Sequence, residues 1–146
     1  MLNRKSHVEF MVLALEESKK ALPHCLPNPP VGCVLVQDGT FMASGYTKEP
    51  GSDHAEASVM QSITGSLEGM VAYVTLEPCS FHGRTPSCAN ALIERGIKEV
   101  FVAIEDPDPR NSGRGIRMLR DAGITVTENI LSDSVSQFLS PYLYKN

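Results

Sequence analysis

Apolar residues recur along the first twenty positions with the spacing of a helix. They lie three or four residues apart, at Val8, Met11, Val12 and Leu15. Ser6 and Glu9 have the spacing of a capping box, in which two side chains satisfy backbone N–H groups at the start of a helix. The pattern therefore predicts an amphipathic helix that begins near Ser6 and packs one face against a core.

Five shorter apolar runs have the length and residue types of strands, and helical segments separate the later ones. The strand-like runs are 31–36, 40–46, 71–76, 99–104 and 124–129. The helical segments are 53–62, 86–95, 115–121 and a final apolar stripe at Val135, Phe138, Leu139 and Tyr142. Asp38-Gly39 joins the first two runs as an antiparallel hairpin. We therefore predict a three-layer α/β fold, a five-stranded mixed sheet with helices on both faces.

Composition and charge narrow the classes of function. The chain has 146 residues, of which 42% are hydrophobic and 21% charged, which suits a single domain over 1–146 that needs no disulfide. A net charge of -4 without basic runs offers no surface for nucleic acid. The first apolar run, Phe10 to Leu15, is too short for a signal peptide or a membrane span. We expect a cytoplasmic protein with reduced thiols that binds a small molecule, and neither nucleic acid nor membrane.

Candidate metal ligands follow two of the predicted strands, at the sheet edge where such folds bind their ligands. Cys79 follows the third strand, and Cys88 falls in the first turn of the next helix, with Thr85 expected as its N-cap and Pro86 as its first residue. The helix dipole favours the thiolate, which is the form that binds metal. His54 begins the preceding helix. One histidine and two cysteines, with a fourth position left to water, are typical of catalytic zinc.

Glu56 lies two residues after His54, and in the first turn of a helix both side chains can reach one point beyond the helix end. A carboxylate that is not a ligand can carry the proton of a water whose pKa the metal lowers to about 7. We therefore expect Glu56 to be catalytic. Two plainer interpretations stay open: Glu56 pairs with Asp53 in a capping box, or Cys79 and Cys88 are a disulfide or two buried thiols.

His-x-Glu followed by Pro-Cys and a second cysteine is the signature of zinc deaminases, although eight residues separate the cysteines here instead of two. From Pro27 to Gly123 the chain resembles the deaminase half of the bifunctional deaminase-reductase of bacterial riboflavin biosynthesis. The resemblance rests on PNPPVGCVLV, HAE, YVTLEPCSFHGRTPSCANALI, EDPDP, GRG and AGI. It implies one zinc-dependent, cytidine-deaminase-like domain with zinc on the histidine and two cysteines above and Glu56 as proton shuttle. The implied reaction replaces the 2-amino group of 2,5-diamino-6-ribosylamino-4(3H)-pyrimidinone 5′-phosphate by oxygen and releases ammonia.

The resemblance also implies a set of substrate-binding residues. The set is Asn28, Phe81, His82, Arg84, Thr85, Asp106 and Asp108. Three positions depart from the family pattern, because Thr47 and Phe81 stand where the family has histidine and Asp108 where it has asparagine. Each change weakens the attraction for a phosphate dianion. An alternative substrate is therefore a different aminopyrimidine, a pterin or a purine without the ribose phosphate, with Phe81 stacking on the ring.

The resemblance further suggests a homo-oligomer, a dimer or larger. Because the chain ends at Asn146, where the riboflavin enzyme continues into its reductase, we expect a stand-alone deaminase whose product a separate reductase reduces. A tRNA adenosine deaminase is a rival, but it has the short cysteine spacing and needs a basic surface. A non-enzymatic zinc protein does not account for an open three-ligand set beside a carboxylate. Cys33 is expected in the core, and Cys25 and His24 in a loop, none with a metal role.

Overall fold

The computed structural model describes residues 4–81 and 87–143, and strands and helices alternate along them. The strands are β1 (Gly32–Gln37), β2 (Thr40–Tyr46), β3 (Met70–Leu76), β4 (Glu99–Ile104) and β5 (Thr125–Glu128). The helices are α1 (Arg4–Lys19), α2 (Ala55–Met60), α3 (Cys88–Glu94), α4 (Arg114–Asp121) and α5 (Ser132–Leu139), and a 3-10 turn, η1 (Ser140–Tyr142), follows α5. Within the described ranges, no helix is long and apolar enough to cross a membrane.

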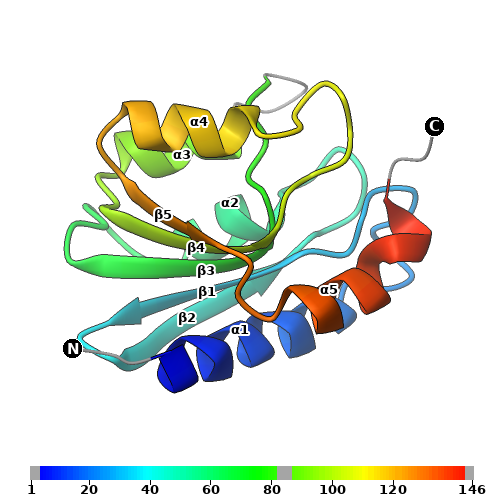
Figure 1. Cartoon of the computed structure of the whole chain (residues 1–146), viewed down its shortest axis with the longest axis horizontal. Helices are drawn as coiled ribbons and strands as arrows, with labels where there is room; N and C mark the ends of the chain where they lie inside the picture. Colours follow the sequence, from blue (N-terminus) through cyan, green and yellow to red (C-terminus); the bar gives the residue numbers. More distant parts are fainter. Residues whose placement is uncertain (1–3, 82–86, 144–146) are drawn as a thin grey trace.

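The strands form one mixed sheet in the order β2-β1-β3-β4-β5. β1 is antiparallel to both β2 and β3, whereas β3, β4 and β5 run parallel to one another. Figure 1 shows α2, α3 and α4 on one face of the sheet and α1 and α5 on the other. The predicted three-layer fold with a five-stranded mixed sheet is therefore confirmed.

The hairpin between β1 and β2 has the turn that the sequence predicts. Gln37 pairs with Thr40, so only Asp38 and Gly39 lie between the strands. Both have positive φ, 50° and 75°, as a two-residue type I′ turn requires. Aspartate and glycine tolerate this conformation, and the turn sets the pairing of Gln37 with Thr40 and of Val36 with Phe41, beyond which the register shifts between Leu35 and Val36.

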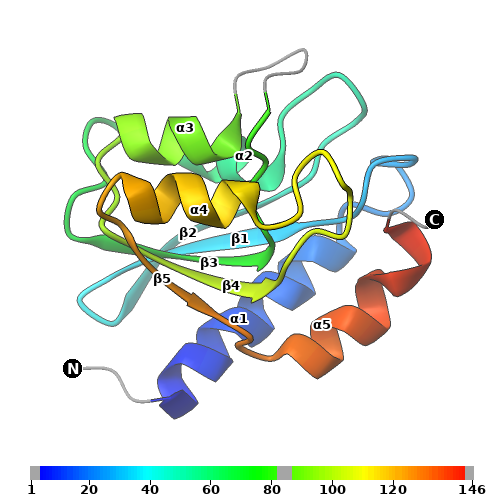
Figure 2. The ribbon, with the colours of Figure 1, turned by 45° about the horizontal axis from the view of Figure 1, so that its top comes forward.

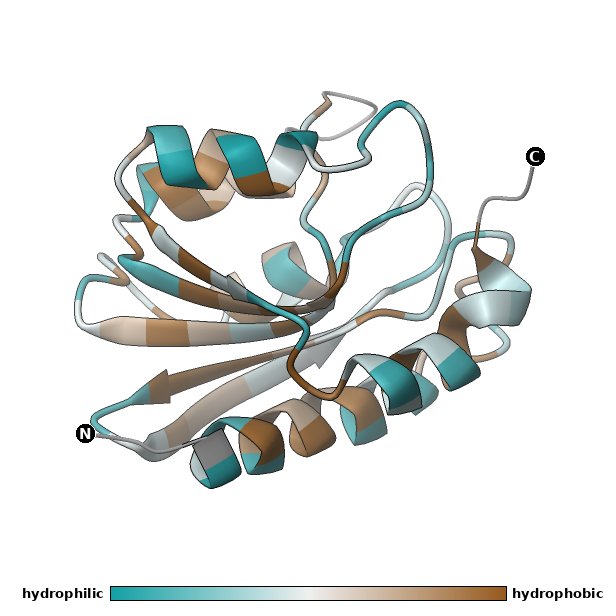
Figure 3. Ribbon diagram, in the orientation of Figure 1, coloured by the Kyte–Doolittle hydropathy of each residue, from teal (hydrophilic) through white to brown (hydrophobic). Residues whose placement is uncertain are grey.

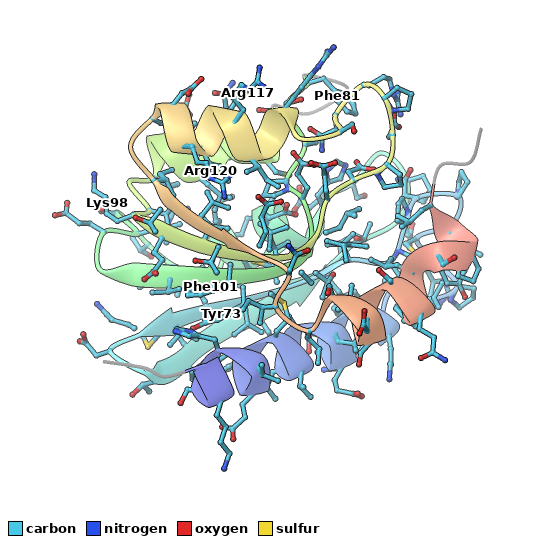
Figure 4. All side chains as sticks on the ribbon, in the orientation of Figure 1. Tyr73, Phe81, Lys98, Phe101, Arg117 and Arg120 are labelled. Carbon is cyan, nitrogen blue, oxygen red and sulfur yellow. The ribbon has the colours of Figure 1, made fainter. Side chains whose placement is uncertain are left out.

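The core lies on both faces of the central strands. Figure 3 shows apolar residues along the strands and on the helix sides that face them. On the α1 side, Tyr73 is fully buried and stacks on Phe101, with ring centroids 4.8 Å apart; Figure 4 labels both residues. The Tyr73 hydroxyl lies 2.6 Å from His7 Nδ1 on α1, so this buried polar group has a partner. These contacts fix α1 against β3 and β4.

The first helix differs from its prediction at two points. α1 begins at Arg4, so Ser6 lies inside its first turn and the predicted capping box at Ser6 and Glu9 is wrong. Val12 is 38% exposed, whereas Met11 and Leu15 are buried against the sheet. Val12 is therefore outside the buried stripe. Valine is apolar, but its position on the helix turns it away from β1 and β3.

The two helices that begin nearest the candidate ligands are shorter than predicted. α2 covers Ala55–Met60 within the predicted 53–62. α3 begins at Cys88, and its N-cap is Ser87, whose hydroxyl accepts a hydrogen bond from the Asn90 N–H at 3.1 Å. The predicted helix start at Pro86 is therefore wrong, because Ser87 is the N-cap, and Thr85 and Pro86 themselves lie outside the described residues.

Candidate active site

The loops that carry the predicted ligands meet at one edge of the sheet because of the strand directions. β2, β3 and β4 run the same way, so their carboxyl ends lie together and α2, α3 and α4 each begin there. Figure 2 shows this edge with the starts of the three helices around it. Three helix N-termini, whose first N–H groups need partners from outside their own helix, therefore lie at one edge of the sheet.

The three predicted metal ligands come together at this edge. His54 is the N-cap of α2, Cys79 follows β3, and Cys88 is the first residue of α3. His54 Nδ1 lies 3.8 Å from Cys79 Sγ and 3.4 Å from Cys88 Sγ. All three ligand atoms are within 4.8 Å of one another. Residues from separate loops thus form one compact ligand set.

The spacing of this ligand set fits tetrahedral zinc. Zn–S bonds of about 2.3 Å and Zn–N bonds of about 2.0 Å place nitrogen and sulfur about 3.5 Å apart at a tetrahedral angle. The two observed nitrogen–sulfur distances, 3.8 and 3.4 Å, lie on either side of that value. Cys79 and Cys88 are both free thiols, so the disulfide interpretation is wrong. The donor set is open, with three protein ligands.

One thiol of the pair is held ready as a thiolate. The pKa of Cys79 is lowered to about 4, chiefly by a hydrogen bond from the Cys88 thiol. The backbone N–H of Cys88, at the start of α3, also donates to Cys79 Sγ at 3.2 Å. The pKa of Cys88 is raised, first because its thiol is the donor of that bond and then because it is buried. Metal binding would therefore have to displace the proton of Cys88.

Glu56 lies beside the ligand set and is almost completely buried, at 4% exposed. Burial raises its pKa to about 7, with the negative charge of Cys79 as the next cause. The N-cap of α2 is His54 and not Asp53, whose carboxylate instead accepts a hydrogen bond from Gln61. Asp53 and Glu56 therefore do not form the N-cap and N3 pair of a capping box, and the plainer interpretation of Glu56 loses its basis.

A pocket of about 480 Å³ opens next to His54, Glu56 and Cys79. Four predicted substrate-binding residues line it: Asn28, Phe81, Asp106 and Asp108. The other three, His82, Arg84 and Thr85, lie outside the described residues. The sequence did not predict that the C-terminal segment also lines the pocket, through Tyr142 and Leu143. The predicted apolar stripe, which included Tyr142, indicated a helix but not where it packs.

One wall of the pocket carries an ion pair whose cation was not among the predicted site residues. Arg110 Nη2 lies 2.6 Å from Asp108 Oδ2, and the guanidinium sits over the Phe81 ring, 4.8 Å from its centroid. Figure 4 shows Phe81 near the loop that leads into α4. Arg110 lowers the pKa of Asp108 by this hydrogen bond. The negative charge that Asp108 introduces is therefore paired with a positive one at the same wall.

Thr47, where the resembling family has histidine, lines the same pocket but uses its hydroxyl on the backbone. Thr47 Oγ1 accepts a hydrogen bond from the Val31 N–H at 3.0 Å and donates to the Val31 carbonyl at 3.4 Å. This hydroxyl fixes the segment that leads into β1. Cys33 and Cys25 are both fully buried and outside the ligand set.

Comparison with known proteins identifies this arrangement. The family model of the cytidine and deoxycytidylate deaminase zinc-binding region matches residues 4–104, which include all three ligand candidates and Glu56. The riboflavin biosynthesis protein RibD of Actinobacillus pleuropneumoniae is 46% identical over 126 residues, which cover 86% of this chain and 34% of that protein. The chain thus spans about a third of the length of this curated relative.

Solved structures agree with the sequence comparison. A structure of Acinetobacter baumannii RibD superposes with a TM-score of 0.92 at 38% identity, over 96% of this chain and 40% of that one. A Thermotoga maritima protein, described as a diaminohydroxyphosphoribosylaminopyrimidine deaminase and 5-amino-6-(5-phosphoribosylamino)uracil reductase, gives 0.89 at 38% identity, over 95% and 40%. In both, the similar part is less than half of the longer chain.

Proposed function

The chain belongs to the zinc-binding cytidine and deoxycytidylate deaminase family, and on that basis we propose that it deaminates 2,5-diamino-6-ribosylamino-4(3H)-pyrimidinone 5′-phosphate by hydrolysis. The observation that carries the proposal is the open set of one imidazole and two thiols with a buried carboxylate beside it. The likeness to proteins named for riboflavin biosynthesis supports this choice of substrate. The proposal treats 1–146 as one deaminase domain.

The proposed zinc ligands are His54, Cys79 and Cys88, supported by their mutual distances and by the low pKa of Cys79. Zinc, when bound, supplies a Lewis acid that lowers the pKa of a water molecule towards neutrality. The ligand set needs both thiols reduced, which fits the predicted cytoplasmic location. A homo-oligomer and a separate reductase for the next step stay predictions from the resemblance.

Glu56 is proposed to move the protons of the reaction. Addition of water forms a C–O bond at the ring carbon that bears the amine, and Glu56 takes the proton that the water loses. Glu56 returns this proton to a ring nitrogen and then helps to move the second proton, from the new hydroxyl group, to the amine, so that the C–N bond breaks, a carbonyl group forms and ammonia leaves. A carboxyl with a pKa of about 7 suits both directions of transfer near neutral pH.

Substrate recognition is proposed to use the walls of the pocket. Asn28 and Asp106 offer hydrogen-bonding groups, and Phe81 offers a flat face for the ring. We propose that Arg110 supplies positive charge for the phosphate, together with Arg84 of the loop between the cysteines. Because Arg110 compensates Asp108, the charge argument for a substrate without phosphate becomes weaker. That second candidate stays open because Phe81 and Thr47 bring no positive charge.

The ratio of kcat/KM for the phosphorylated and dephosphorylated aminopyrimidine tests the proposal. Each charge-assisted hydrogen bond to phosphate is worth about 1.5–3 kcal/mol, so we expect a preference of about 10- to 150-fold per bond for the phosphorylated compound. Equal values would reject the phosphate assignment while leaving deamination in place. Release of no ammonia from either compound, with zinc present, would reject the substrate.

The Arg110→Ala variant tests the charged wall. It removes the cation and leaves Asp108 uncompensated, so KM for the phosphorylated compound should rise by about 3- to 10-fold, which is modest because the Arg110 side chain is exposed to solvent. The matched control is the double variant Asp108→Asn with Arg110→Ala, which removes both charges and should recover part of the loss. An unchanged KM in the single variant would contradict the role of Arg110.

A further inference from the structure

Two buried polar residues next to the ligand set have no part in the mechanism above. Glu77 is 3% exposed and Asn111 is fully buried. Glu77 directly follows β3 and precedes the Pro78-Cys79 pair, whereas Asn111 lies in the loop between β4 and α4. A buried carboxylate and a buried amide are costly unless all their hydrogen bonds are made, so their partners indicate what they do.

Glu77 receives hydrogen bonds from three backbone N–H groups, two in the loop between β4 and α4 and one in the first turn of α4. Its Oε1 accepts from Asp106 at 3.0 Å and from Gly113 at 2.9 Å, and its Oε2 accepts from Ile116 at 2.9 Å. Gly113 is the N-cap of α4 and has no side chain that could satisfy the helix start. The carboxylate of Glu77 therefore caps α4 from the segment that carries Cys79.

Asn111 connects the same two segments from the other side. Its Nδ2 donates to the Pro78 carbonyl at 3.2 Å and to Asp106 Oδ2 at 3.4 Å. Its Oδ1 accepts from the Ser80 N–H at 3.1 Å and from the Gly115 N–H at 3.2 Å. Asn111 thus holds the residues on both sides of Cys79 and the carboxylate of Asp106 at once.

The backbone of α4 at Gly115 lies directly against the backbone of Pro78. A Cβ at Gly115 would lie 1.8 Å from the Pro78 carbonyl oxygen, so only glycine lets α4 come this near. The segment 77–80 and the start of α4 therefore form one packed unit. Its hydrogen bonds hold the two residues that flank the proposed ligand Cys79 and also the pocket residue Asp106.

We propose that Glu77 and Asn111 are positioning residues that hold Cys79 and Asp106 in fixed places relative to each other. The proposal rests on the proposed function, since it assigns to these residues the placement of a zinc ligand and a substrate-facing acid. Partners of metal ligands typically change metal affinity or activity by about 10- to 100-fold when they are replaced. A residue that only stabilised the fold would lower thermal stability without such an effect.

Two conservative variants test the proposal. Glu77→Gln puts an amide donor against backbone N–H donors, and Asn111→Asp puts a carboxylate against the Pro78 carbonyl and Asp106. In folded protein, zinc affinity measured by chelator competition should fall by about 10- to 100-fold in each, and the absorption spectrum of the cobalt(II)-substituted protein should change. The matched controls are Glu105→Gln and Asn90→Asp, whose side chains are exposed. Unchanged affinity and spectrum in both variants would overturn the proposal.

Hydrogen exchange on the unaltered chain gives a test that does not depend on how the variants fold. If the packed unit of residues 77–80 and the start of α4 holds Cys79 in place for zinc, then zinc binding should in turn stabilise this unit. Zinc should therefore slow hydrogen exchange of the Ser80, Gly113 and Ile116 amides. The Ala122 amide at the far end of α4 is the internal control. Equal exchange with and without zinc would overturn the proposal. Zinc affinity and exchange need no turnover, so failure of the substrate assignment would show separately, as binding of zinc without release of ammonia.

Discussion

Glu56 and Glu77 are two buried carboxylates that line the same pocket and have opposite surroundings. Glu77 accepts three hydrogen bonds from backbone N–H groups that the fold holds in place. Glu56 stands beside two thiols, and burial raises its pKa to about 7. Burial alone therefore does not distinguish the two carboxylates. Fixed backbone N–H groups hold Glu77 in place, whereas Glu56, with its raised pKa, is the proposed proton carrier.

Removal of a proposed zinc ligand should have the largest effect, because it should abolish the function of the site around Glu56 and leave the hydrogen bonds of Glu77 in place. Cys79→Ala, Cys88→Ala or His54→Ala leaves two ligands, which are too few for a stable catalytic site, so zinc and turnover should both be lost. Metal analysis of the purified protein should fall from about one zinc per chain to near zero. The fold should persist, because the anchoring bonds of Glu77 do not involve these side chains.

Cys25→Ala is the matched control for this experiment. Cys25 is a free, fully buried thiol outside the ligand set, so its variant should keep both zinc and activity. Full activity in a protein without zinc would reject both the proposed metal site and the proposed proton-transfer role of Glu56.

Replacement of Glu56 should have the next largest effect. Glu56→Gln keeps the size of the side chain but cannot take up a proton, so kcat should fall by about 10²- to 10⁴-fold, as is usual when a general acid–base is lost. Zinc content should not change, because Glu56 is not among the proposed ligands. Steady-state ammonia release, with metal analysis on the same sample, measures both quantities.

The exposed Glu105→Gln variant is the control and should turn over normally. Near-normal kcat in Glu56→Gln would show that Glu56 does not transfer protons in the reaction. The proposed functional difference between Glu56 and Glu77 would then be wrong.

Most of the fold could be predicted because β1, β3 and β4 are nearly continuous apolar runs and the hairpin turn has a strong local signal. The predicted run 99–104 is β4, and Asp38-Gly39 forms the expected turn. The misses concern properties that a local pattern does not contain. The side of α1 on which Val12 lies depends on how the helix packs, and the start of α3 depends on the cap that Ser87 provides.

The proximity of His54, Cys79 and Cys88 could be predicted because these residues follow strands at one edge of the sheet and two of them stand at helix starts. Glu77 and Asn111 were not predicted, because their partners are 29 or more residues away in most of their bonds. Arg110 was missed for a related reason: nothing in the sequence shows that it lies over Phe81. A site held by long-range hydrogen bonds becomes visible only when the chain is folded.

The pH dependence of stability gives the smallest effect and the most direct measure of how Glu56 differs from an anchored carboxylate. The relevant protein is the metal-free form, in which burial raises the pKa of Glu56 from 4.5 to about 7. Below pH 4.5 the carboxyl is protonated in both folded and unfolded chains and brings no penalty. Between pH 4.5 and 7 the unfolded chain releases the proton while the folded chain retains it, so unfolding becomes easier as the pH rises.

We therefore expect the free energy of unfolding of the metal-free protein, minus that of Glu56→Gln, to fall between pH 4.5 and 7 and then stay level. The total fall is at most roughly 3 kcal/mol, from 1.36 kcal/mol per pKa unit. Urea titrations at several pH values measure it, and the subtraction removes contributions that both proteins share, including most of that from Cys79. Zinc should reduce the fall, since a nearby cation favours the ionised carboxylate. A flat difference curve for the metal-free protein would mean that burial does not raise the pKa of Glu56, and its role as proton carrier would have to be abandoned.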